Sequence, residues 1–318
     1  MNLNIQTDIS NEVVAPTLLA GWPGMGSVGV GAINYLRRQL DAVPFAEVDM
    51  SEYFCHEEVV VENGIAKLPD MPSHVFYRVP GRDIIIFESE RQVGGQGGTS
   101  LMNKVLDLAE KLDVQAIYTA AAWALPARHT DDAHVMGISN QETLRDHIVP
   151  HGVEVLEQGT ISGLNGLLLG FAAARGISAA CLLATLPGHY MQMPNPKASR
   201  EIVRVLSSLL DLDTDLAEMD EAVEEMGRVM EDIEDKIRSA ITSMEGEGQE
   251  KPEELGEVDE EAVPAKVMER IERMFLQVSH TNSDQQSKVM AAKLKEELDK
   301  WNLYGVYEDR FLNLFREP

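Results

Sequence analysis

Three glycines near the start of the chain have the spacing of a dinucleotide-binding fingerprint. In "GWPGMGSVGVGAINYL", Gly24, Gly26 and Gly29 satisfy the pattern G-x-G-x-x-G. Such a loop binds pyrophosphate because its glycines let the backbone approach closely and the following helix offers free N–H groups. Glu47 and Asp49 lie at the distance where this fingerprint places an acid for the ribose hydroxyls. The implied chemistry is binding of a nicotinamide or flavin cofactor.

The surroundings of this first glycine loop favour a packing role. Trp22 and Pro23 crowd the tight turn, and the strand-like runs over residues 43–90 follow one another with hardly a helix between them. A dinucleotide-binding half would alternate strands and helices regularly. We therefore expect no cofactor here, and expect the glycines to let the first helix pack on the first strand. Trp22 and Met25 could then be exposed at an interface.

A second glycine-rich loop, "RQVGGQGGTS", follows an apolar run and precedes a predicted helix capped by Thr99 or Ser100. With Arg91 beside it, the loop could hold an anion. A flexible crossover at a sheet edge is the interpretation we prefer, and no Lys-Ser or Lys-Thr pair follows to make it a Walker loop. The candidate residues of this loop are Gly94, Gly95, Gly97 and Gly98.

Two polar loops follow apolar runs that are typical of buried strands. "WALPARHTDDAH" contains Arg128 and His129, and "LPGHYMQMPNP" contains His189 and Tyr190. Open α/β sheets keep their ligand sites where strands end, so the two loops could line one cleft. Their spacing matches no standard metal motif, and no nucleophile elbow is present. We expect no metal and assign no catalytic residues.

The chain alternates strand-like and helix-like patterns up to about residue 212, which predicts an α/β fold. We expect three layers, α/β/α, around a mostly parallel mixed sheet. The runs "VQAIYTAAAW" and "ISAACLLATL" lack polar alternation, as central strands do. "VFYRVPGRDIIIF" predicts a hairpin that turns at Pro80-Gly81, and Gly176 has the position of a helix C-cap.

From residue 212 the pattern changes to a heptad-like stripe on an acidic helix that reaches residue 244. A Gly- and Pro-containing acidic stretch follows, and apolar faces recur at 267–278 and 290–301. The sequence thus predicts a core domain over 1–212, and a helical extension over 213–318 with a mobile linker at about 245–263. The extension could pack within one subunit or between subunits.

Composition excludes some partners. The net charge is −26, and residues 213–318 carry 29 acidic and 13 basic side chains. This charge repels phosphate backbones, so neither nucleic acid nor an anionic membrane is expected as a partner. No apolar run is long enough for a membrane span, and we expect a soluble, cytoplasmic protein. Cys55 and Cys181 belong to no metal-binding or redox motif and are expected to be reduced packing residues.

Three stretches carry a family resemblance. "GWPGMGSVGVGAINYL", "TAAAWALPARHT" and "GLNGLLLGFAAARGISAACLLATLPGHY" resemble the proteasome assembly chaperone type 2 family over roughly residues 13–210. The resemblance implies a sheet similar to that of nucleoside phosphorylases, self-assembly, and non-enzymatic help in assembling proteasome subunits. It also implies protein clients, either proteasome-like subunits or others. Some archaeal relatives dock through a C-terminal tripeptide that Arg316-Glu317-Pro318 does not match.

Two hypotheses follow. The first is a homo-oligomeric chaperone or scaffold that acts through protein–protein contacts and is not an enzyme. The alternative is an enzyme or binder of a nucleoside or a phosphorylated small molecule, with the glycine loops as its anion cradle.

Overall fold

The computed structural model describes residues 2–54, 56, 59–245, 274, 293–295 and 298. The chain divides into two compact units, Met1–Glu247 and Gly248–Pro318. The first unit contains the sheet and all the elements discussed below. Cys55, most of the predicted linker and most of the apolar faces at 267–278 and 290–301 lie outside the described residues.

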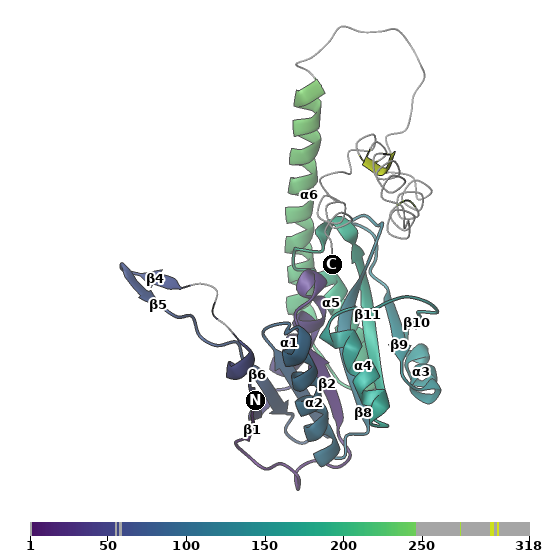
Figure 1. Ribbon diagram of the computed structural model, residues 1–318. Helices are drawn as coiled ribbons and strands as arrows, with labels where there is room; N and C mark the ends of the chain where they lie inside the picture. Colours follow the sequence, from purple (N-terminus) through teal and green to yellow (C-terminus); the bar gives the residue numbers. More distant parts are fainter. Residues whose placement is uncertain are drawn as a thin grey trace. The chain divides into compact units, whose positions relative to one another are not determined.

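The first unit is built on a nine-stranded mixed sheet (Figure 1). Its four central strands, β7-β2-β8-β11, run parallel, and antiparallel strands flank them on both sides. The order across the sheet is β1 (Asn2–Ile5), β3 (Val43–Asp49), β6 (His74–Arg78), β7 (Ile84–Ser89), β2 (Thr17–Gly21), β8 (Ala116–Leu125), β11 (Ala179–Pro187), β9 (Val135–Ser139) and β10 (Val153–Val155).

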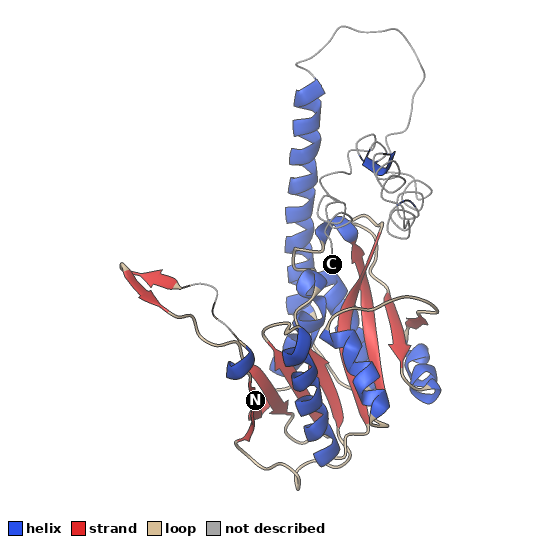
Figure 2. Cartoon of the chain, in the orientation of Figure 1, coloured by secondary structure: helices blue, strands red, loops and turns tan. Residues whose placement is uncertain are grey.

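Helices cover both faces of this sheet, which makes the predicted three layers (Figure 2). One face carries α1 (Val28–Gln39), α3 (Glu142–Ile148) and α5 (Pro196–Leu209), and the other carries α2 (Gly95–Lys111) and α4 (Leu164–Ala174). Every residue of β11 is buried, as expected of a strand covered on both sides. The α/β prediction and the central place of β8 and β11 are therefore confirmed.

Several local predictions are also confirmed. β6 and β7 form the antiparallel hairpin around Pro80-Gly81, and Val79 N–H donates to Ile84 O at 3.0 Å. Gly176 ends α4 with a φ of +72°, the left-handed conformation that suits glycine. Cys181 is fully buried in the core, and burial raises the pKa of its thiol to about 12. A thiol in this environment stays protonated and acts as a packing group.

The predicted start of α2 is wrong. The helix begins at Gly95, after the N-cap Gly94, and not at Thr99 or Ser100. The glycine run is poor helix sequence, but the apolar side chains that follow are buried against the sheet and decide the register. Most of the second glycine loop is therefore the first turn of a helix.

Two regions differ from the simple alternation of strands and helices. The described residues of the run over 54–64 belong to no strand of the large sheet. Instead β4 (Val60–Glu62) pairs with β5 (Ile65–Lys67) in a separate hairpin. Residues 135–155, to which the sequence pattern assigned no element, form β9, α3 and β10. β9 pairs antiparallel with β11 and extends the sheet beyond its parallel centre.

The acidic stripe forms one helix, α6 (Ala217–Glu245), as predicted. Leu212 and Met219 are buried in the core beneath α1 and α5. Tyr35 Oη donates to Asp215 O at 2.7 Å, and Arg38 forms an ion pair with Glu218 at 2.8 Å. The start of the extension is thus anchored on the α/β core by both apolar and polar contacts.

Candidate functional site

The candidate site lies where β8 and β11 end. The two strands are parallel neighbours, so their exit loops leave the sheet at the same edge. A groove of about 1080 Å³ is lined by residues of both loops, by the start of α5 and by α6 between Val223 and Glu231. The sequence pointed to the two loops. The third wall, α6, comes from the acidic helix, for which the sequence left packing within one subunit and packing between subunits both open.

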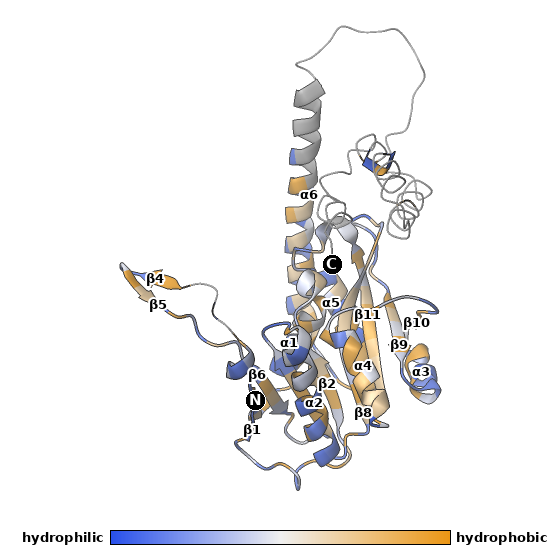
Figure 3. Cartoon of the chain, in the orientation of Figure 1, coloured by the Kyte–Doolittle hydropathy of each residue, from blue (hydrophilic) through white to orange (hydrophobic). Residues whose placement is uncertain are grey.

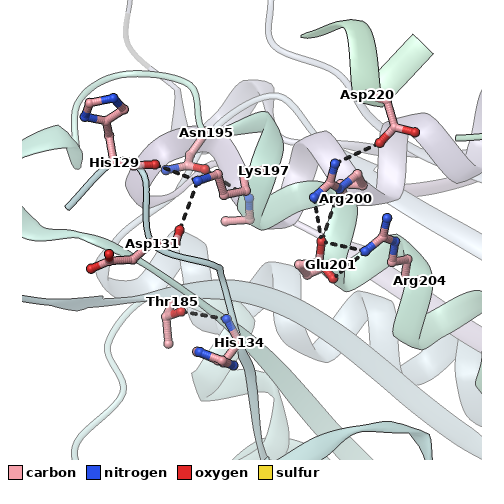
Figure 4. Close-up of polar contacts among 11 residues, drawn as sticks. His129, Asp131, His134, Thr185, Asn195, Lys197, Arg200, Glu201, Arg204 and Asp220 are labelled. Atoms are coloured by element: carbon pink, nitrogen blue, oxygen red, sulfur yellow. Dashed lines mark hydrogen bonds and ion pairs between the residues drawn. The ribbon is translucent and has the colours of Figure 1, made fainter. Parts of the chain in front are cut away.

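Lys197 ties the first exit loop to α5. Its Nζ donates to the carbonyl oxygens of His129, at 2.6 Å, and Asp131, at 2.9 Å (Figure 4). Burial lowers the pKa of Lys197, while Asp132 works in the opposite direction. The ammonium group therefore caps backbone carbonyls of the loop, and two of its three protons are already used inside the protein.

Further charges at this edge are also paired internally. Arg200 forms ion pairs with Asp220 at 2.8 Å and with Glu201 at 3.1 Å, and Arg204 contacts Glu201 at 3.2 Å. Arg200 Nη1 donates from α5 to Asp220 on α6. These charges fix the helix that forms one wall of the groove to the helix beside it.

The four candidate residues of the exit loops have different surroundings. Arg128 is exposed on the groove, and its backbone N–H donates to Asp131 Oδ2 at 2.9 Å. His129 is half-buried and forms a T-shaped ring pair with buried Tyr190, with ring centroids 6.5 Å apart. His189 lies in the short 3₁₀ helix Gly188–Tyr190, and its side chain is outside the described parts. The structure thus places Arg128 and His129 at the groove.

In the first glycine loop, the glycines allow close packing of α1 on the sheet. A Cβ on Gly29 would lie 1.9 Å from the carbonyl oxygen of Ala120, so only glycine lets α1 lie this close to β8. Gly26 has a φ of +59°; its N–H donates to Met191 O at 2.7 Å, and its carbonyl accepts from Asn195 N–H at 2.8 Å. The helix that packs closely is α1, as expected, but the strand it meets at Gly29 is β8.

The dinucleotide interpretation does not fit this geometry. β3, which carries Glu47 and Asp49, is separated from β2 by β6 and β7. The fingerprint needs the acid on a strand next to the glycine loop, where it can reach the ribose. There is open space beside Gly24, where a Cβ would lie no closer than 4.0 Å to any atom, the nearest being the side-chain nitrogen of Asn165. The N–H of Gly26, which a pyrophosphate would need as a donor, already donates to Met191 O.

Trp22 is fully buried, so the expectation that it is exposed at an interface is wrong. Its ring packs on Phe87 with centroids 5.1 Å apart. The Asn165 side chain accepts from Trp22 N–H at 3.0 Å and donates to Trp22 O at 3.1 Å, which holds the end of β2 against α4. Met25 is 40% exposed and remains available at the surface.

The second glycine loop borders a smaller hollow of about 260 Å³. Gly94, Gly95 and Gly98 line it together with apolar side chains of α2 and α4, while Gly97 packs against Val93 and Tyr53. Arg91 lies over the Phe54 ring at 5.6 Å and does not line the hollow. An apolar lining without a cation is a poor anion cradle.

Among the described residues no group of three or more His, Cys, Asp or Glu side chains could hold a metal ion.

Comparison with known proteins settles the family. Residues 18–234 match the family model described as PAC2 family, a span of more than half the chain. The chain belongs to the PAC2 family. The resemblance inferred from the glycine motif and the two later stretches is thereby confirmed. The matched span runs from β2 into α6 and includes all three walls of the groove.

Solved PAC2-like structures have the same fold. PbaB of Pyrococcus furiosus, described as an archaeal proteasome activator, is 25% identical with a TM-score of 0.62, and the match covers 73% of this chain and 98% of PbaB. PbaA of the same organism, described as an archaeal homologue of proteasome-assembly chaperone, is 23% identical with a TM-score of 0.59, and the match covers 76% of this chain and 96% of PbaA.

A relative was also found by sequence. An uncharacterized protein of Methanocaldococcus jannaschii is 22% identical over 240 residues, which cover 74% of this chain and 88% of that protein.

None of the helices among the described residues is long and apolar enough to cross a membrane.

Proposed function

We propose that this PAC2 protein is a non-enzymatic assembly chaperone or scaffold that associates with itself and acts through protein–protein contacts in the cytoplasm. The observation that carries the proposal is the match to nearly the whole of PbaB, at 25% identity and with a common fold. PbaB is described as a proteasome activator and PbaA as a homologue of an assembly chaperone. Proteasome-like subunits are accordingly the first clients to test.

The use of polar groups at the sheet edge supports a binding role over catalysis. Lys197 donates to loop carbonyls, and Arg200 is paired with Asp220 and Glu201. General acid–base or nucleophilic chemistry needs a positioned group that is free to reach a substrate. Lys197 and Arg200 are instead engaged in holding α5, α6 and the exit loop together.

The proposal is tested by affinity capture from the native host. Full-length tagged protein is expected to enrich proteasome-type subunits or subunits of another assembling complex, and an excess of untagged protein should compete the capture. A tag-only preparation is the control. Light scattering on the purified protein at micromolar concentration tests self-association separately, and a strict monomer there would remove that part of the proposal.

The size of the groove supports one alternative, binding of a nucleoside or a phosphorylated small molecule. The groove lies at the carboxyl ends of β8 and β11 and includes Arg128 and Arg228. A ligand present at 100 times its dissociation constant would stabilise the fold by about 2.7 kcal/mol. Melting temperatures in the presence of phosphate, nucleosides and nucleotides test this; a rise of several degrees would favour the alternative, and unchanged melting is what the chaperone proposal predicts.

A further inference from the structure

The hairpin formed by β4 and β5 buries none of its own strand residues. We define the arm as residues 59–71, and all six strand residues in it are exposed. Asn63 and Gly64 both have positive φ, +51° and +80°, as a tight hairpin turn requires. In Figure 1 the arm leads away from the large sheet. A two-stranded hairpin alone in water is marginally stable, so another surface is needed to stabilise it.

The arm is also strongly apolar (Figure 3). Among the described residues, fifteen large apolar side chains are exposed, and six of these lie on the arm. In the register of the hairpin, Val60 and Ile65 share one face and Val61 lies on the other, so the arm exposes apolar side chains on both faces. Exposed apolar side chains gathered in this way mark an interaction site. The six are Val59, Val60, Val61, Ile65, Leu68 and Met71, with exposed fractions from 40% to 64%.

The same chain offers a concave apolar surface. We define the hollow as the 260 Å³ space lined by residues of the second glycine loop together with Met102, Leu164, Leu167 and Phe171. Leu167 is 49% exposed. Because a cavity of about 150 Å³ accommodates benzene, the hollow has room for one or two aliphatic side chains of the arm.

The short helix that precedes the arm in sequence lies against the second glycine loop, which borders the hollow. The short helix Ser51–Tyr53, which precedes the arm, packs on the second glycine loop: a Cβ on Gly97 would lie 3.2 Å from Tyr53 Cβ. Ser100 Oγ donates to Tyr53 Oη at 3.5 Å. A convex and a concave apolar surface carried by one chain can meet those of a second copy around a two-fold axis.

Charge favours a second copy as the partner. The described residues that line the hollow include no charged side chain. On the arm, Glu62 and Lys67 form an ion pair of 2.9 Å, which leaves Asp70 as its one unbalanced charge. Two copies of a chain with net charge −26 repel each other over most of their surface. Copies therefore approach most easily through apolar surfaces that carry little charge, such as these two, whereas a basic partner would bind the acidic surface.

We propose that the arm binds in the hollow of a second copy, and that two copies exchange arms reciprocally. This inference rests on the self-association in the proposed function and names the surfaces that produce it. Each copy then contributes one arm and one hollow, so the contact occurs twice per dimer.

The experiment compares three variants of the full chain. Val61→Asp with Ile65→Asp puts charge on the arm, and Leu167→Asp puts charge at the hollow. Val14→Asp, at a residue that is 77% exposed just before β2, is the matched control at the opposite edge of the sheet. Sedimentation velocity over a concentration series should show association weakened at least roughly 30-fold by the arm and hollow variants, as for a hot spot, and unchanged by the control.

Mixing the two variants tests the exchange itself. The arm variant keeps an intact hollow and the hollow variant an intact arm, so an equimolar mixture should form a heterodimer that neither variant forms with itself. Absence of this heterodimer overturns the exchange. A hollow variant that associates as strongly as the wild type also overturns it, because the arms would then bind each other and not the hollow. Far-UV circular dichroism melting confirms that each variant is folded.

The same measurements separate this inference from the proposed function. A monomeric wild-type chain contradicts the self-association in the proposed function. A wild-type oligomer that the arm variant leaves unchanged contradicts only the role of the arm.

Discussion

The two glycine-rich loops of this PAC2 protein both connect a strand to a helix, yet their glycines serve different purposes. Around Gly29 the space for a side chain is filled by the backbone of β8, because a Cβ there would lie 1.9 Å from Ala120 O. A Cβ on Gly94 would have no atom within 4 Å, and that loop opens on the hollow. A glycine cluster can thus mean close packing of backbone or an open surface, and the neighbouring strand decides which.

The largest expected effect comes from adding a methyl group in the packed loop. Gly29→Ala forces α1 away from a central strand that is held on both sides, so neither partner can yield cheaply. We expect a loss of about 4 kcal/mol in the free energy of unfolding, or failure to fold. Chemical denaturation measures it, and a loss below about 1 kcal/mol would contradict the close packing of α1 on β8.

A smaller effect is expected within the second loop, where two positions can be compared directly. A Cβ on Gly98 would lie 2.2 Å from Val93 O, but this carbonyl belongs to a loop and not to a strand paired on both sides. We expect Gly98→Ala to cost about 2 kcal/mol. Gly94→Ala, the matched control in open space, should change stability by no more than about 0.5 kcal/mol. Equal effects at the two positions would show that the contact at Gly98 does not matter.

The smallest expected effect is a pH dependence at the base of the second loop. Ser89 Oγ donates to Arg91 O at 2.7 Å, so the buried His74 donates from Nδ1 to Ser89 Oγ at 2.8 Å. Nε2 of His74 is then unprotonated, buried and without a hydrogen-bond partner among the described residues. Burial lowers the pKa of His74 below its ordinary value of 6.5, although Glu90 works in the opposite direction.

The sign of the dependence follows from this lowered pKa. Well above pH 6.5 the imidazole of His74 is neutral in both the folded and the unfolded chain, so it adds no pH dependence. Below pH 6.5 the unfolded chain takes up the proton first, so the free energy of unfolding decreases as the pH falls. Melting temperatures of the wild type should therefore decrease more steeply from about pH 7 to about pH 5 than those of His74→Gln. Parallel curves for the two proteins would refute the role of His74.

Much of the fold could be predicted from the sequence because the signals are local. The uninterrupted apolar runs of β8 and β11 predicted central strands, and the heptad spacing predicted α6. The strands β9 and β10 were missed because they are only five and three residues long; β9 directly follows a polar loop, and β10 directly follows a short helix. The run over 54–64 is rich in valine, which suits any strand, and nothing in its pattern says that its partner is β5 and not the large sheet.

The candidate site was only partly predictable for the same reason. Position after a buried strand pointed to Arg128 and His129, and the adjacency of β8 and β11 brings their exit loops to one groove. No feature of the sequence indicated the role of Lys197. A lysine in the first turn of a helix can have many partners, and only the fold brings the carbonyls of His129 and Asp131 to its Nζ.

The sequence by itself determined the α/β class, the acidic helical extension and the family, because hydrophobic period, charge and an unusual glycine motif are properties of the chain alone. Tertiary structure decided what the glycines are for, that Trp22 is buried, and that α6 forms a wall of the groove. These depend on which strand lies beside which. The order β7-β2-β8-β11 brings Ala120 against Gly29 and moves Glu47 and Asp49 out of reach of the glycine loop, and no short-range pattern specifies that order.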